Sequence, residues 1–342
     1  MAYRWRRGRV KILVTGGAGY IGSAVAADLV DAGNEVIVFD NLSSGSARAV
    51  PKKALLVTGD LSNSELLKSV FQEHSITGVL HFAASIEAGE SMKVPEKFFR
   101  NNTVNTLTLL ETMLEFRVKR FVFSSTAAVY GNPERTPIQE NDGVKPTNAY
   151  GESKLLVERM LQWSHRIHGL CYASLRYFNA AGATADLGED HHPESHLIPI
   201  VLQVASGQRD SVAIYGTDYP TADGTCVRDY IHISDLSSAH LLAYQRLGQS
   251  SEPESLIYNL GSGQGFSVRE VVDSAVRVTG RRIQVDECPR RPGDPAVLVA
   301  SSEKIRRELG WAPKFSKLDD IISSAWLWRQ RNPQGYGKVA AQ

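Results

Sequence analysis

The side chains best suited to acid–base chemistry are Tyr150 and Lys154, in the run Tyr-Gly-Glu-Ser-Lys. The apolar residues that follow recur at helical spacing, so a phenol and an ammonium four residues apart lie on one face of a predicted helix. A phenol ordinarily titrates near ~10, and a fixed positive charge beside it favours the phenolate. We therefore predict that Tyr150 accepts a proton near neutral pH. The spacing alone is also compatible with a non-catalytic arrangement, in which a solvated lysine lies beside a half-buried tyrosine ring.

A glycine-rich turn precedes the first predicted helix. A β-branched strand at 10–15 leads into Gly-Gly-Ala-Gly-Tyr-Ile-Gly at 16–22, and Gly33 ends the helix that follows. Such glycines let the backbone approach a pyrophosphate, and the first N–H groups of the helix bind it. Asp40 follows a second strand at 35–39, where its carboxylate would accept hydrogen bonds from ribose hydroxyls and repel a 2′-phosphate. The pattern favours NAD over NADP.

Strands and helices keep alternating beyond this unit. Strands are predicted at 54–57, 78–82, 120–124 and 172–177, and helices at 64–74, at 95–116 and from Tyr150 onward. This order is typical of a Rossmann-type, doubly wound parallel sheet in an α/β protein. Ligands bind at the carboxyl ends of such strands. We therefore expect Asp60 and the segments 82–84, 124–126 and 177–179 to line one crevice.

The alternation fades after Asn179, which predicts a smaller α/β C-terminal domain that binds the substrate. We expect residues 1–9 to form a basic flexible arm and 10–180 an NAD-binding domain, to which 227–260 returns. Residues 181–226 and 261–334 would form the substrate domain, with a helix at 197–206. The tail, 335–342, is expected to fray after Pro333.

Two features of the second half could bind ions. The histidines at 191, 192 and 196, with Asp190, lie in an acidic stretch. Adjacent histidines do not readily converge on one ion, so we predict a flexible loop and no metal. Arg228 and the turn at 290–294 supply two separate arginine sites, which suit an anionic diphosphate.

Composition restricts the possible partners. The 342 residues carry 38 basic and 37 acidic side chains, a net charge of +1, so no nucleic acid or anionic membrane is expected. No apolar run approaches the ~18 residues of a membrane span. The three cysteines have no metal-binding spacing and favour free thiols in a reducing compartment, so we predict a cytoplasmic protein.

Seven motifs together resemble the UDP-glucose 4-epimerase family of extended short-chain dehydrogenase/reductases. They are the glycine turn, Asp40-Asn41, His-Phe-Ala-Ala at 81–84, Ser-Ser-Thr at 124–126, the run at 150–154, Arg-Tyr-Phe-Asn at 176–179, and Asp-Gly at 223–224 continuing into Arg-Asp-Tyr-Ile-His at 228–232. The resemblance spans roughly residues 10–328, and the last motif is much more specific than the glycine turn.

The resemblance implies a tightly held NAD and 4-epimerisation of a UDP-hexose (UDP-glucose/UDP-galactose) through a transient 4-keto sugar. Tyr150 would be the acid–base group, Lys154 would hold the nicotinamide ribose and lower the pKa of Tyr150, and Thr126 would hydrogen-bond the 4-oxygen. The implied cofactor-binding residues are Gly16, Gly19, Tyr20, Ile21, Gly22, Asp40, Asn41, Asp60, Leu61, Phe82, Ala83, Ala84, Asn102, Tyr150, Lys154 and Tyr177. The implied substrate-binding residues are Thr126, Asn179, His196, Leu197, Ala213, Tyr215, Arg228, Arg291 and Asp294. A homodimer through the helices at 95–116 and 150–168 is also implied.

Three positions depart from the family's pattern. Ile86 stands where some members carry a lysine, and His196 where some carry an asparagine. Leu298 occupies the gate for N-acetylated sugars, which is a tyrosine in strict glucose/galactose enzymes and a small residue in broader ones. Leucine is intermediate, so UDP-N-acetylhexosamine stays an alternative substrate.

Other activities are compatible with the same fold. Dehydratases place an Asp-Glu pair directly after the threonine, where this chain has Ala127-Ala128, so elimination of water lacks its catalysts. A UDP-pentose (xylose/arabinose) epimerase is harder to exclude, because the missing hydroxymethyl group costs a pocket little selectivity. A non-catalytic NAD-binding sensor would keep the glycine turn but would not need Tyr150, Lys154 and Thr126.

Overall fold

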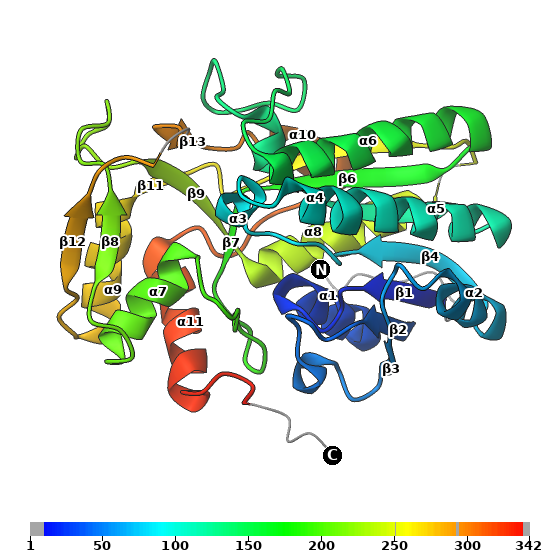
Figure 1. The fold of residues 1–342 in the computed structure, drawn as a ribbon, viewed down its shortest axis with the longest axis horizontal. Coiled ribbons are helices and arrows are strands. Elements are labelled where there is room, and N and C mark those ends of the chain that lie inside the picture. The colour runs from blue at the N-terminus through cyan, green and yellow to red at the C-terminus, as the bar shows by residue number, and fades with distance from the viewer. Residues whose placement is uncertain (1–9, 250, 292–293, 338–342) are drawn as a thin grey trace.

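A seven-stranded parallel sheet forms the centre of the molecule (Figure 1). The computed structural model describes residues 10–249, 251–291 and 294–337, so the predicted basic arm lies outside the described residues. The strands follow the order β10-β6-β5-β4-β1-β2-β3. Their bounds are β1 Lys11–Thr15, β2 Glu35–Asp40, β3 Leu55–Thr58, β4 Ile76–His81, β5 Arg120–Thr126, β6 Cys171–Tyr177 and β10 Ser255–Leu260. The order reverses direction between β1 and β4, which is where such sheets bind ligands.

Helices cover both faces of this sheet. The helices α1 (Tyr20–Asp31), α8 (Ile233–Arg246) and α10 (Glu303–Leu309) share one apolar core with it, and α2 (Ser64–Glu73), α5 (Asn105–Glu115) and α6 (Ala149–His168) share the other. The central strands are nearly continuous runs of buried apolar side chains, as expected of a sheet covered on both faces. The predicted Rossmann-type fold is confirmed.

The helix predicted at 95–116 is interrupted. After a short α3 (Ala88–Ser91), the chain forms α4 (Pro95–Phe98), a π-helical segment from Phe99 to Val104, and then α5. Apolar periodicity does not distinguish a π turn from an α turn, because the added residue changes the register only locally. Segments of this kind recur at functional sites, and this one contains Asn102.

A smaller body lies beside the sheet, at the left in Figure 1. Its core is formed by α7 (Leu197–Ala205), α9 (Val268–Thr279) and α11 (Leu318–Arg331). Strand β8 (Val212–Tyr215) pairs with β12 (Val285–Cys288), while β9 (Val227–His232) pairs with β7 (Asn179–Ala181), β11 (Gly265–Ser267) and β13 (Val297–Leu298). Residues 227–260 are predicted to return to the first domain. Within them, β10 joins the large sheet and α8 joins its core, whereas β9 pairs, among the described strands, with those of the smaller body.

The end of the chain is anchored rather than frayed as far as Tyr336. The Tyr336 backbone N–H donates to Asp190 Oδ2 at 2.8 Å, and its ring packs 5.4 Å from that of Trp328. These partners are distant in sequence, so local composition did not reveal them. Residues 338–342 lie outside the described part of the chain. None of the described helices is long and apolar enough to cross a membrane.

Candidate functional site

Tyr150 lies in the first turn of α6, beside the end of β5. The hydroxyl of Thr126 lies near that of Tyr150 and acts to lower its pKa, and Thr126 also accepts the N–H of Ala128 at 3.1 Å. Close approach of helix and strand depends on Gly151, because a Cβ there would lie 2.6 Å from the carbonyl oxygen of Ala128. Asn148 caps the helix by accepting the N–H of Gly151 at 2.8 Å. The structure thus brings together two of the three predicted catalytic side chains.

Lys154, one turn later, completes this group. Its side chain is buried, and Nζ donates to the carbonyl oxygen of Ser124 at 2.9 Å and lies 5.0 Å from the ring centroid of Phe123. Burial lowers the pKa of Lys154 to about 7. Tyr150, Thr126 and Lys154 therefore form one contiguous polar group at the carboxyl end of β5.

The predicted lowering of the pKa of Tyr150 does not occur in the chain by itself. Burial raises that pKa, and the hydrogen bond with Thr126 offsets only part of the rise. The physical reason is that both groups have lost water, while the ammonium is directed at the Ser124 carbonyl. Any lowering has to come from charge added when ligands bind.

We expect the buried ammonium of Lys154 to make stability depend on pH. Its folded pKa, about 7, lies below the unfolded value of 10.5, so the unfolded chain binds more protons between these values and stability rises with pH across this window. Relative to Lys154→Met, the wild-type free energy of unfolding should increase by up to about 1.4 kcal/mol per pH unit above pH 7. Urea unfolding of the NAD-free proteins at pH 7, 8 and 9 measures this difference. A difference that stays constant with pH would contradict it.

Asn102 connects the π-helical segment to α6. Its Oδ1 accepts the N–H of Ser85 at 2.8 Å, and its Nδ2 donates to Ser153 Oγ at 3.0 Å. Thr106 in turn donates to the Asn102 carbonyl at 2.6 Å. These bonds fix the loop after β4 against the helix that carries Tyr150. The position agrees with a lining residue of the crevice, and its contact with a cofactor stays a prediction.

The glycine turn forms a cradle that a larger residue would fill. Gly16 has φ +71°, and a Cβ there would lie 2.4 Å from the backbone nitrogen of Ala83. A Cβ on Gly22 would lie 2.2 Å from the carbonyl oxygen of Gly16. In the described chain no side chain caps α1, so its first N–H groups are available to an anion. This geometry fits the pyrophosphate of a dinucleotide.

The acidic residues expected at the ribose and adenine lie beside this cradle. Asp40 accepts the Ala18 N–H at 2.9 Å and the Leu42 N–H at 2.8 Å, and burial raises its pKa. Asn41 donates to Asp60 Oδ2 at 2.6 Å. Asp40 thus links the glycine turn to the end of β2 and still has lone pairs for hydroxyl donors.

A buried histidine that sequence reasoning did not identify supports the wall of the crevice. The ring of His240, on α8, packs 4.9 Å from Phe82 and 5.5 Å from Tyr177, centroid to centroid. Burial lowers its pKa to about 4, so the imidazole is neutral. Phe82 follows β4 and Tyr177 ends β6, on either side of β5, so His240 supports two predicted cofactor-lining rings from separate strands. Because His240 lies on the buried face of an amphipathic helix, its position in the sequence did not indicate a functional role.

The predicted substrate residues cluster on the strands of the smaller body. Arg228 forms an ion pair with Asp294, and the guanidinium of Arg291 stacks 3.9 Å from the ring centroid of Tyr215. Asn179 donates to the Asp229 carbonyl at 3.0 Å. Ala213 lies on β8 and Leu197 begins α7, while residues 292–293 of the predicted turn lie outside the described part. Two guanidiniums, one paired with a carboxylate and one stacked on an aromatic ring, can bind an anionic group.

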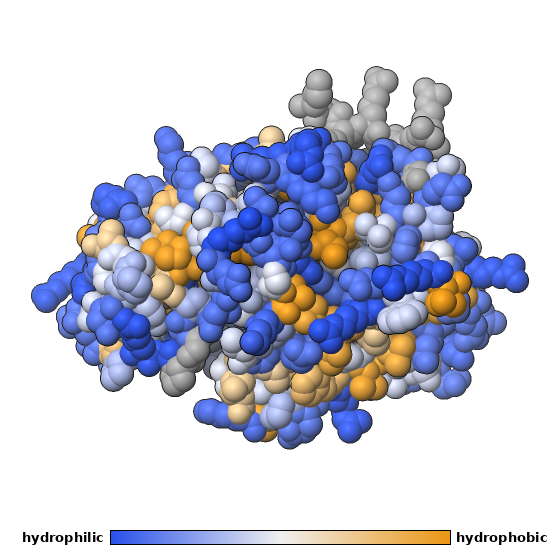
Figure 2. All heavy atoms as spheres, turned by 90° about the horizontal axis from the view of Figure 1, so that it is seen from above, coloured by the Kyte–Doolittle hydropathy of each residue, from blue (hydrophilic) through white to orange (hydrophobic). Residues whose placement is uncertain are grey.

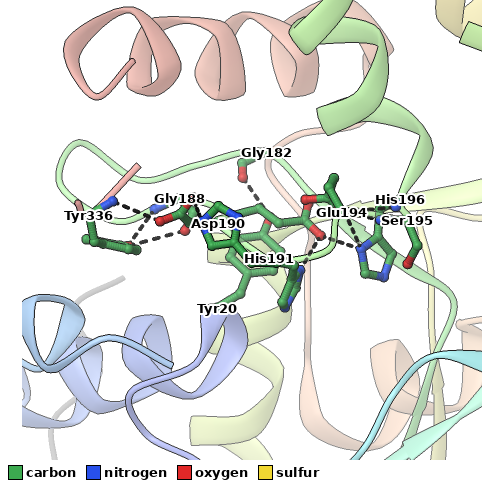
Figure 3. Close-up of polar contacts among 11 residues, drawn as sticks. Tyr20, Gly182, Gly188, Asp190, His191, Glu194, Ser195, His196 and Tyr336 are labelled. Carbon is green, nitrogen blue, oxygen red and sulfur yellow. Dashed lines mark hydrogen bonds and ion pairs between the residues drawn. The ribbon is translucent and has the colours of Figure 1, made fainter. Parts of the chain in front are cut away.

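The loop predicted to be flexible is instead packed, and His196 has a different environment from the one expected. Its Nδ1 lies 2.8 Å from Glu189 Oε1 and 3.0 Å from Glu194 Oε1, and His191 Nδ1 lies 3.1 Å from the same Glu189 oxygen (Figure 3). Glu189 and Glu194 raise the pKa of His196 to about 10 against the effect of its own burial. His192 lies apart, 80% exposed, beside Asp190. Sequence reasoning missed the two glutamates, although their spacing with the histidines was visible.

A second missed feature is a buried ion pair next to the group formed by Tyr150, Thr126 and Lys154. Arg176 and Glu158 have side chains only 4% and 1% exposed, and Glu158 also accepts the Ser125 hydroxyl at 2.6 Å. Burial lowers the pKa of Arg176, but the hydrogen bonds and charge of Glu158 raise it by more, so the net shift is upward. Glu158 follows Lys154 by one helical turn, which was the available signal. The pair fixes α6 against β5 and β6.

Comparison with known proteins gives consistent matches along the chain. Residues 12–261 match the NAD dependent epimerase/dehydratase family. A UDP-glucose 4-epimerase of Halalkalibacterium halodurans is 53% identical over 95% of this chain and 97% of its own. The solved structure of the UDP-glucose 4-epimerase from Brucella ovis in complex with NAD has a TM-score of 0.90 at 43% identity, covering 93% of this chain and 97% of that one. That from Bifidobacterium longum in complex with NAD+ and UDP also has a TM-score of 0.90, at 38% identity, covering 95% and 100%.

Proposed function

Because the chain belongs to the NAD dependent epimerase/dehydratase family, we propose that it interconverts UDP-glucose and UDP-galactose by epimerisation at C4. The observation that carries this proposal is the group formed by Tyr150, Thr126 and Lys154 at the end of β5. The cofactor is NAD, and the uncapped start of α1 and the glycine cradle fit its pyrophosphate.

The side chains of this group have distinct roles in the reaction. Tyr150 takes the proton of the 4-hydroxyl and later returns it to the 4-keto sugar. Thr126 holds the 4-oxygen in line with that phenol, since its hydroxyl lies beside Tyr150. Lys154, whose ammonium donates to the Ser124 carbonyl in the chain by itself, would hold the nicotinamide ribose. When bound, NAD accepts the C4 hydride, returns it to the other face of the sugar, and adds a positive charge near Tyr150.

The remaining residues bind the two ligands. We assign Gly16, Gly19, Tyr20, Ile21, Gly22, Asp40, Asn41, Asp60, Leu61, Phe82, Ala83, Ala84, Asn102 and Tyr177 to the cofactor, and Asn179, Leu197, Ala213, Tyr215, Arg228, Arg291 and Asp294 to the UDP-sugar. The arginines on β9 and after β12 support this division, because they supply positive charge beyond the sheet. Segments 10–180 and most of 227–260 form the NAD-binding domain in this assignment, and the smaller body binds the sugar nucleotide.

The range of sugars depends on the wall beside the hexose. Leu298 pairs with Arg228 across β13 and β9 and packs on the apolar cluster that contains Ala127 and Phe178. A leucine leaves more room than a tyrosine at this position. UDP-N-acetylhexosamines are therefore one alternative class of substrate. UDP-pentoses are the other, because the missing hydroxymethyl group costs a pocket little selectivity.

A turnover assay with UDP-galactose and no added NAD tests the proposal. Formation of UDP-glucose without external cofactor supports an epimerase that retains its NAD. UDP-xylose and UDP-N-acetylgalactosamine, assayed in parallel, rank the substrates. No turnover of any of the three, with or without added NAD, would contradict the proposed activity. No turnover of UDP-N-acetylglucosamine at high enzyme concentration would exclude the N-acetylated sugars.

We further propose a cytoplasmic homodimer. The three cysteines are unpaired in the described chain, which suits a reducing compartment. Both helices expected at the contact carry exposed apolar side chains: Leu107 on α5 is 43% exposed, and Trp163 and Ile167 on α6 are 62% and 67% exposed. Figure 2, which views the side where α6 lies in Figure 1, shows orange apolar atoms between blue ones. Patches of this kind mark protein interfaces.

Charges placed in this patch should separate the dimer. Leu107→Glu with Trp163→Glu would desolvate two carboxylates at the interface, so the mass by light scattering should fall from twice the chain mass of 37.6 kDa to that value. Leu327→Glu is the matched control, since Leu327 is 51% exposed on α11 and should leave the mass unchanged. A doubly substituted protein that keeps the dimer mass would place the interface elsewhere.

A further inference from the structure

The loop between β7 and α7 gathers two glutamates and two histidines into one cluster, which we name the 189–196 cluster. Its members are Glu189, His191, Glu194 and His196, and each offers one ligand atom, all lying within 4.8 Å of one another. Figure 3 shows three of them, His191, Glu194 and His196, on a single loop. The spacing, with one, two and one residues between successive members, lets the loop wrap around one point.

Fewer hydrogens are available than the contacts in the cluster require. The Nδ1 atoms of His191 and His196 both lie against the same Glu189 oxygen, at 3.1 and 2.8 Å, and His196 Nδ1 also lies 3.0 Å from Glu194 Oε1. Two N–H groups would have to serve three contacts. Side chains of the two glutamates are only 8% and 5% exposed, so two carboxylates lie side by side with little water. A cation at the centre would satisfy all four groups at once.

The donor set identifies the class of cation. Imidazole nitrogen and carboxylate oxygen suit Zn²⁺ and neighbouring transition metals, whereas Ca²⁺ and Mg²⁺ prefer oxygen alone. In a tetrahedral zinc site, bonds of ~2.0–2.2 Å place the ligand atoms ~3.3–3.6 Å apart. The three contacts of 2.8–3.1 Å would open slightly to reach that separation, and the remaining pairs of ligand atoms, all within 4.8 Å, would close to it. Two carboxylates also neutralise the charge of a divalent ion.

The surrounding contacts hold the ligands in place, as partners of metal ligands commonly do. Glu194 Oε1 accepts the backbone N–H groups of Ser195 and His196, both at 2.8 Å. Tyr20 donates its hydroxyl to the Gly182 carbonyl at 2.6 Å and presents its ring edge to His191, with centroids 6.2 Å apart. The cluster therefore lies between the glycine turn and the start of α7.

We propose that the 189–196 cluster binds one Zn²⁺-class ion through Glu189, His191, Glu194 and His196. Four protein ligands leave no open position, so the ion is structural and takes no part in the reaction. It fixes the loop that joins β7 to α7 beside the glycine turn. The assignment is independent of the proposed activity, although it makes His196 a metal ligand in place of the substrate contact expected from the sequence.

Metal analysis of the full chain tests this proposal. The protein is purified without a polyhistidine tag, stripped with a chelator, and titrated with ZnCl₂ and with CoCl₂. We expect one zinc per chain and the intense visible bands of tetrahedral Co²⁺, neither displaced by excess MgCl₂. A stripped protein that binds no zinc, or a cobalt spectrum typical of six oxygen ligands, would overturn the proposal.

Variants locate the ion. Glu189→Gln keeps the shape of the side chain, and this variant and His191→Gln should each weaken zinc binding at least about tenfold. His192→Ala is the matched control, because His192 adjoins the cluster but is 80% exposed beside Asp190. It should bind zinc like the wild type. Circular dichroism and NAD content confirm folding of each variant. Zinc binding that is equal in all folded variants would overturn the assignment, as would binding lost in His192→Ala alone.

Discussion

Tyr150→Phe should lower kcat by about 10²–10⁴-fold, the usual contribution of general acid–base catalysis, and should leave bound NAD in place. The substitution removes one oxygen and keeps the ring that packs 6.4 Å from Phe98. Among the described residues, the neighbour that loses its contact with the hydroxyl is Thr126. Initial rates with UDP-galactose, and the NAD released on denaturation, measure the two effects separately.

Tyr172→Phe provides the matched control for this loss. Tyr172 is buried at the beginning of β6, at the opposite end of the sheet from Tyr150, and also loses one hydroxyl. It should keep the wild-type rate. If Tyr150→Phe retained more than about a tenth of the wild-type activity, the proton acceptor would be another group.

Arg176→Met should destabilise the fold by about 3–5 kcal/mol, because it leaves Glu158 buried without its counter-charge. Arg176 donates to both carboxylate oxygens of Glu158, at 2.9 and 2.5 Å, and to the Tyr130 hydroxyl at 2.9 Å. Tyr130 continues the network by donating to Asn259 Oδ1 at 2.7 Å. Urea unfolding of the NAD-free protein, followed by far-UV circular dichroism, measures the loss.

The double variant Arg176→Met with Glu158→Met distinguishes an uncompensated charge from lost packing. Two apolar side chains of similar length remove the stranded carboxylate, and such replacements are often close to neutral. We expect the double variant to regain at least half of the stability that the single variant loses. A double variant as unstable as Arg176→Met would show that packing, rather than charge, stabilises this junction of α6, β5 and β6.

Lys154 is also buried, but unlike Arg176 it donates to a neutral backbone carbonyl rather than to a carboxylate. The site thus keeps a cation in a poorly solvated position with no carboxylate partner. A ligand hydroxyl or phosphate that meets this ammonium would relieve part of the cost of its burial. Strain of this kind is typical of positions selected for function rather than stability.

The sequence by itself determined the sheet and indicated the side chains that we propose to react. Apolar runs, Gly16, Gly22 and Asp40 predicted the first β-α-β unit, because strand periodicity, tight turns and helix starts depend on neighbouring residues. The spacing from Tyr150 to Lys154 placed both side chains on one helix face. Motif resemblance then indicated the family that the comparisons confirmed.

Only the tertiary structure decided which distant groups meet. It directs Lys154 at the Ser124 carbonyl, so burial controls its pKa, and it joins Arg176 to Glu158 across the α6–β6 boundary. The π-helical turn at Asn102 and the anchoring of Tyr336 on Asp190 also arose from long-range contacts. The same holds for the 189–196 cluster, where loop closure selects His191 and not its neighbour. Such contacts depend on three-dimensional packing, which the local pattern of a chain does not contain.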